Sequence, residues 1–311
     1  MSPSFLDLTL GPIVNATLII TFILGVVTMQ AYTYIRSFPN DTIILKSLVT
    51  AIWFMQLAFT TCLCQGVYTM TVTYFGQVLH LLRIPVAMTG AVVIGILIAH
   101  SVQIFFIYRI YKFSRALYVS ITLWFFAACL HGISLTAAAE VIKLDSIPLL
   151  QEEWKWLFTF LFVGDAALDL LIAATLCFYL KKQIQSIPLR NTTILIDRLL
   201  SYTIQTGLVT SLVAVAAAVM FIAMPENYMW TAFFICMPGF FASALLANLN
   251  NRLNFRQPDS SVTSPSQAMN TFSRNSMVDP NISNTLKSED VTDPTISSVS
   301  SSWRPHALTT V

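Results

Sequence analysis

LTLGPIVNATLIITFILGVVTMQAYTYI, residues 8–35, lies between Asp7 and Arg36 and contains no charged side chain. A helix that crosses the hydrocarbon core of a bilayer, roughly 30 Å thick, needs about 20 apolar residues at about 1.5 Å each. The stretch is longer than that, and its many Leu, Ile, Val and Phe residues suit lipid. We therefore expect a membrane-spanning helix over about 11–34.

The composition of the whole chain extends this expectation beyond one helix. Of 311 residues, 56% are hydrophobic and 10% are charged, and the mean hydropathy is +0.70. Soluble domains have about 25% charged residues, so this chain has too few to cover a soluble surface. A net charge of +2 argues against nucleic acid as a partner, and five cysteines are too few for a disulfide scaffold. The composition predicts an integral membrane protein whose main partner is the lipid bilayer.

Further charge-free runs follow the first one along the chain. The last of them is long enough for two helices, with a turn at 225–227. The predicted spans lie at about 11–34, 48–70, 86–108, 116–138, 156–180, 199–224 and 228–250. Unbroken apolar runs of this length exclude barrel strands, which alternate over about ten residues. The predicted fold class is an all-α polytopic membrane protein with seven transmembrane helices.

The basic residues predict the orientation of this bundle. Alternate connections between the spans, together with the C-terminal tail, contain 14 of the 17 Lys and Arg residues. Because cytoplasmic segments are enriched in Lys and Arg, we expect the N-terminus outside and the C-terminus in the cytoplasm. The expected location is the plasma membrane or an endomembrane.

Three segments follow from these assignments. Residues 1–10 form a short extracellular or lumenal tail, residues 11–251 the seven-helix membrane domain, and residues 252–311 a cytoplasmic tail. The cytoplasmic tail has 13 serines between Ser260 and Ser302 and few large apolar residues, so it cannot bury enough surface to fold. We predict that it is disordered and available to cytoplasmic partners.

Two carboxylates interrupt the fifth predicted span. Asp165 and Asp169 are four residues apart and therefore share one face of a helix, at depths of about 14 and 20 Å. His131 of the fourth span lies about 10 Å below the same end, within about one turn of Asp165. Ionisable residues inside a membrane are candidate functional groups because their insertion is costly. Asp165, Asp169 and His131 form the predicted intramembrane polar cluster.

Two interpretations of this cluster stay open. In one, it binds a proton or a cation and opens to the outside; in the other, it forms interhelical hydrogen bonds that only stabilise the packing. A metal-dependent hydrolase is disfavoured because His100 is expected deeper than His131 and no His-x-x-x-His or His-Glu-x-x-His spacing occurs. We predict no enzyme activity, no metal and no cofactor, and we expect the cysteines to pack as small apolar residues.

Four stretches of the chain resemble a known family. They are Leu-Gly-Pro at 10–12, Phe-Pro-Asn-Asp at 38–41, QIFFIYRIY at 103–111, and 197–252, which contains TGLVTS and SALLANLNNR. Through them the chain resembles integral membrane proteins of fungi, mostly basidiomycetes, that are grouped as a domain of unknown function. The resemblance covers about 10–255 and implies a membrane location and seven helices, with no established activity. It matches Asp169 to a family position and gives Asp165 no counterpart.

Two functions are compatible with these predictions. The first is receptor-like sensing of a small lipophilic ligand, because the short outer connections are too small for a domain that binds a protein ligand. A retinal protein is excluded, since 228–250 contains no lysine for a Schiff base. The alternative is a proton-linked small-molecule transporter that uses the intramembrane aspartates together with His131.

Overall fold

The computed structural model describes residues 3–77, 83–114, 117–144, 152–186, 190–224 and 227–251. These residues belong to one unit, Met1–Gln257. The predicted cytoplasmic tail, 252–311, lies outside the described residues, as do Pro225 and Glu226 of the predicted turn.

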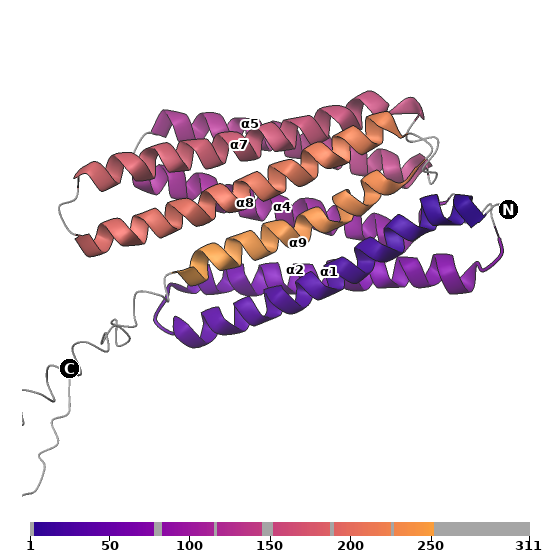
Figure 1. The fold of residues 1–311 in the computed structure, drawn as a ribbon, viewed down its shortest axis with the longest axis horizontal. Coiled ribbons are helices and arrows are strands. Elements are labelled where there is room, and N and C mark those ends of the chain that lie inside the picture. Colours follow the sequence, from indigo (N-terminus) through magenta and orange to yellow (C-terminus); the bar gives the residue numbers. More distant parts are fainter. Residues whose placement is uncertain are drawn as a thin grey trace, which may run out of the picture. The chain divides into compact units, whose positions relative to one another are not determined.

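Seven α-helices make up nearly all of the described chain (Figure 1). They are α1 (Pro3–Ser37), α2 (Ile43–Tyr68), α4 (Val86–Ser114), α5 (Leu117–Leu144), α7 (Lys155–Ser186), α8 (Arg190–Ala223) and α9 (Met229–Asn250). A π-helical turn, Thr69–Thr73, continues α2. Among the described residues, six of the helices are long and apolar enough to cross a membrane, and the part of α8 with described side chains, Gly207–Ala223, is apolar as well. The all-helical class is confirmed, and the count of seven spans stays a prediction.

The helices are longer than the predicted spans. α1 begins at Pro3 rather than near residue 11, so most of the predicted N-terminal tail is helical. α5 continues to Leu144 rather than ending near 138. Lys143 Nζ donates to Glu140 Oε1 at 2.6 Å, and this pair supports the last turn of α5. Charge-free runs mark only the part of a helix that suits lipid, whereas backbone hydrogen bonds continue the helix through polar residues beyond it.

The helices alternate in direction and pack in a closed circuit. Each helix contacts the next one along the chain, and α1 contacts α9. α4 also contacts α7 and α9, so it has neighbours on several sides. Figure 1 shows that α1, α4, α7 and α9 begin at the same end of the bundle as the chain itself. We call this the N-terminal end, and the other the opposite end.

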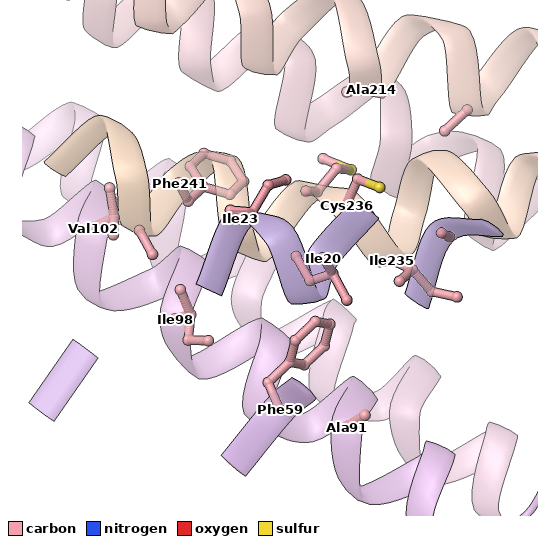
Figure 2. Close-up of a cluster of buried hydrophobic side chains, with 14 of the residues drawn as sticks. Ile20, Ile23, Phe59, Ala91, Ile98, Val102, Ala214, Ile235, Cys236 and Phe241 are labelled. Atoms are coloured by element: carbon pink, nitrogen blue, oxygen red, sulfur yellow. The ribbon is translucent and has the colours of Figure 1, made fainter. Parts of the chain in front are cut away.

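Apolar side chains from all seven helices form the core of the bundle. Figure 2 shows part of it, with Ile20 of α1, Phe59 of α2 and Phe241 of α9. Large apolar side chains also face outward: Phe22 is 74% exposed and Leu18 is 66% exposed. Such exposure costs about 25 cal/mol per Å² in water but not against lipid tails. Apolar exposed faces of this kind suit a membrane-embedded protein.

Candidate functional site

A cavity of about 180 Å³, here named the main cavity, lies inside the bundle. α1, α2, α4, α5, α7 and α9 line it, mostly with the half that is nearer the N-terminal end. Its aromatic lining residues are Phe59, Phe158, Phe162, Trp230, Phe234 and Phe241. Its polar lining residues, among those described, are His131, Ser134, Asp165 and Thr231. For comparison, an apolar protein cavity of about 150 Å³ takes up benzene.

Helical periodicity directs these side chains to one place. On α7, Phe162 and Asp165 are three residues apart and share a face of the helix. On α5, His131 and Ser134 have the same spacing. The ring centroids of Phe162 on α7 and Trp230 on α9 are 6.2 Å apart. α7 and α9 therefore form an aromatic wall of the main cavity.

The polar groups of the main cavity differ in their hydrogen bonding. His131 Nδ1 lies 2.5 Å from the backbone carbonyl four residues earlier, and Ser134 Oγ donates to the carbonyl four residues earlier at 3.0 Å. Thr231 Oγ1 donates to the carbonyl three residues earlier at 2.6 Å. Asp165 has no hydrogen-bond or ion-pair partner among the described residues. Among the described residues, the Asp165 side chain thus differs from these three in having no hydrogen-bond partner.

Asp169 lies one turn farther along α7, at a second and smaller cavity of about 30 Å³. Gln103 Nε2 of α4 donates to Asp169 Oδ1 at 3.0 Å. Both side chains are buried, with Asp169 7% and Gln103 2% exposed. Asp169 Oδ2 and Gln103 Oε1 have no partner in the described part of the chain. Thr210 of α8 lines the same small cavity, which therefore joins α4, α7 and α8.

The predicted polar cluster is thus divided between two cavities. Asp165 and His131 line the main cavity together, whereas Asp169 lines the small cavity. Phe241 lines both and lies between them. Both interpretations of the cluster therefore have a structural counterpart: Asp165 faces an internal space, and Asp169 makes an interhelical hydrogen bond.

The expectation that His100 and His131 lie at different depths is wrong. Their ring centroids are 4.1 Å apart. The reason is the length of α5, because a helix that ends at Leu144 places His131 about 20 Å from that end, and His100 lies about 21 Å from the start of α4. Within the residues that the structure describes, no group of three His, Cys, Asp or Glu side chains could hold a metal ion. The cysteines are free.

Sequence reasoning did not identify Gln103 as the partner of Asp169. The signal that could have found it is the burial of an amide in an apolar span, since polar side chains in membrane helices bond to one another across interfaces. Gln103 begins the stretch 103–111, and Arg109 of the same stretch donates to Asn248 Oδ1 in the stretch 197–252. Two stretches that carry the family resemblance are therefore in contact, near the opposite end of the bundle.

The fold and the site define a class of protein: a membrane-embedded all-helical bundle with an internal apolar cavity. Residues 165–254 match the model of a family described as a family of unknown function (DUF6534). No curated protein and no solved structure matches the chain. The match supports the resemblance over the stretch 197–252 and includes both aspartates of α7.

Proposed function

We propose that this protein is a membrane receptor for a small lipophilic molecule, which binds in the main cavity. The observation that carries the proposal is the cavity itself, with about 180 Å³ of space, an aromatic lining and few polar groups. Pockets for small molecules have this character: an apolar lining with a small number of polar groups that orient the ligand. The proposal includes seven spans, with the N-terminus outside, so that the cavity lies in the outer half of the bundle.

The position of the cavity supports a receptor role, because a bound ligand can affect the arrangement of several helices. An occupant contacts six helices at once, including α4 and α9. These two helices are joined again by Arg109 and Asn248 near the opposite end. A ligand that binds one arrangement of α4 and α9 more tightly than another therefore shifts the population of both ends of the bundle. The segment after α9 is the predicted cytoplasmic tail, which would report the change.

The proposal is tested by replacing a small residue of the cavity wall with a larger one that fills the cavity. The full chain, purified in phosphatidylcholine nanodiscs, is titrated with 4-phenylbutanol, and binding is followed by tryptophan fluorescence because Trp230 lines the cavity. Ala137 is buried in the cavity wall on α5, whereas Ala139 on the same helix is exposed. Ala137→Phe should weaken binding by about tenfold or more, or about 1.4 kcal/mol, because the new ring occupies the ligand's space.

Ala139→Phe is the matched control and should bind the alcohol as the unmodified chain does. Ala137→Leu fills less of the cavity and serves where the phenyl ring unfolds the bundle. Equal affinity in all of these variants, after subtraction of empty nanodiscs, would contradict a binding site in the main cavity.

A proton-linked transporter is the second candidate. The observation that favours it is the placement of two carboxylates in successive cavities along α7, Asp165 in the main cavity and Asp169 in the small cavity. A carrier would show uptake into proteoliposomes that is driven by a proton gradient and lost in Asp169→Asn. Binding without gradient-driven uptake leaves the receptor as the function.

A further inference from the structure

The hydrogen bonding of the main cavity distinguishes one of its polar groups from the rest. His131, Ser134 and Thr231 each bond to a backbone carbonyl three or four residues earlier in the chain. No hydrogen bond or ion pair joins Asp165 to another described residue, and the described lining contains no Lys or Arg. An ionised carboxylate in an apolar interior is costly without an opposite charge. The described lining therefore contains no Lys or Arg that could balance the negative charge of an ionised Asp165.

The wall beside this carboxylate is aromatic. Phe162 lies one turn before Asp165 on α7, and its ring centroid is 6.2 Å from that of Trp230 and 6.0 Å from that of Phe234. The Trp230 and Phe234 centroids are 6.4 Å apart. The faces of aromatic rings attract cations, and Trp does so most strongly. Aromatic rings next to a lone carboxylate favour a positively charged ligand with an apolar body.

We infer that the main cavity binds a small organic amine, with the ammonium group at Asp165 and the apolar body against Phe162, Trp230 and Phe234. This inference rests on the proposed function and names its ligand class. The volume restricts the ligand to about one aromatic ring with a short chain, since about 180 Å³ is little more than the space that holds benzene. His131 and Ser134, on the facing helix α5, line the same space.

The test compares two probes of the same shape, 4-phenylbutylamine and 4-phenylbutanol, on the full chain in phosphatidylcholine nanodiscs. We expect the amine to bind about tenfold more tightly than the alcohol. In Asp165→Asn the two affinities should become equal within about twofold, because the amide has the shape of the carboxylate but not its charge. Asp169→Asn is the matched control: it removes a carboxylate one turn away that does not line the main cavity, and the preference for the amine should remain.

The outcomes separate the inference from the proposed function. If neither probe binds, the proposed function fails. If both bind with equal affinity to the unmodified chain, the cavity binds lipophilic molecules without selecting amines, and the inference fails alone. A preference for the amine that survives Asp165→Asn also overturns it, since the charge then lies elsewhere. Should Asp165→Asn not fold, Asp165→Glu retains the charge and must retain the preference, while Asp165→Ser must lose it.

Discussion

At the scale of single residues, the two aspartates of α7 have different environments although they are one turn apart. Asp169 accepts a hydrogen bond from Gln103 in a buried interface beside the small cavity, and Asp165 faces the main cavity without a partner among the described residues. A hydrogen bond inside a membrane protein contributes about 0.6 kcal/mol on average. Leaving a buried acceptor without its donor costs more, about 1–3 kcal/mol. The cost of about 1–3 kcal/mol applies to the loss of Gln103, because Asp169 stays buried when its partner is removed.

We therefore expect Gln103→Leu to lower the free energy of unfolding by about 1–3 kcal/mol, measured in detergent micelles by denaturant titration. The double variant Gln103→Leu with Asp169→Leu should recover most of this loss, because both ends of the bond become apolar. Ser101→Ala is the control on the same helix, since Ser101 Oγ donates only to a carbonyl of its own helix at an exposed position. A Gln103→Leu variant as stable as the Ser101→Ala variant would show that the bond does not contribute to stability.

At the scale of helices, small residues determine how closely neighbours approach. A Cβ atom on Gly239 of α9 would lie 2.4 Å from Ile20 Cδ1 and 2.8 Å from Ile23 Cγ2 of α1. A Cβ on Gly207 of α8 would lie 2.7 Å from Ala173 Cβ of α7. Helices in membranes associate through this close packing, because lipid tails are as apolar as the side chains. A larger residue at these contacts would therefore force the neighbouring side chains or helices to shift.

Gly239→Ala should destabilise the bundle by about 1–3 kcal/mol, because the added methyl group displaces α1 from α9. Gly132→Ala is the matched control, since a Cβ there has no atom within 4 Å and the position is exposed. Alanine is the better helix former, so the control should be neutral or more stable by about 0.5–1 kcal/mol. Thermal unfolding of both variants in the same detergent compares them, and equal midpoints would exclude a steric role for Gly239.

At the scale of the whole molecule, the orientation is a prediction that experiments on cells can decide. Lys and Arg are concentrated in alternate connections, which places the N-terminus outside and the C-terminus in the cytoplasm. In cells that express the chain at their surface, an antibody should reach an N-terminal epitope tag without permeabilisation and a C-terminal tag only after it. If the chain remains in internal membranes, selective permeabilisation of the plasma membrane should expose the C-terminal tag alone. The reverse pattern in either case would invert the predicted topology.

The helices follow from local sequence, whereas most of their contacts do not. Charge-free runs located every described α-helix, and helices such as α5 continue through polar residues beyond the predicted spans. Because α5 extends beyond its predicted span, His131 lies farther from the end of the helix than expected, and its ring contacts that of His100. The shared face of Asp165 and Asp169 follows from spacing alone. An amide in an apolar span marks Gln103 as a candidate for an interhelical bond, but its pairing with Asp169 does not follow from the sequence, because no local pattern specifies which helices are neighbours.

Composition alone is enough to predict an apolar helical protein with few charges, because a single stretch such as 8–35 shows whether a helix suits lipid or water. The sequence also places two carboxylates on one helical face. The packing of the helices, in contrast, places Asp165 at a cavity of about 180 Å³ and Asp169 against Gln103. The reason is physical: a cavity and an interhelical hydrogen bond depend on how separate helices pack, and residues 66 positions apart in the chain meet only then.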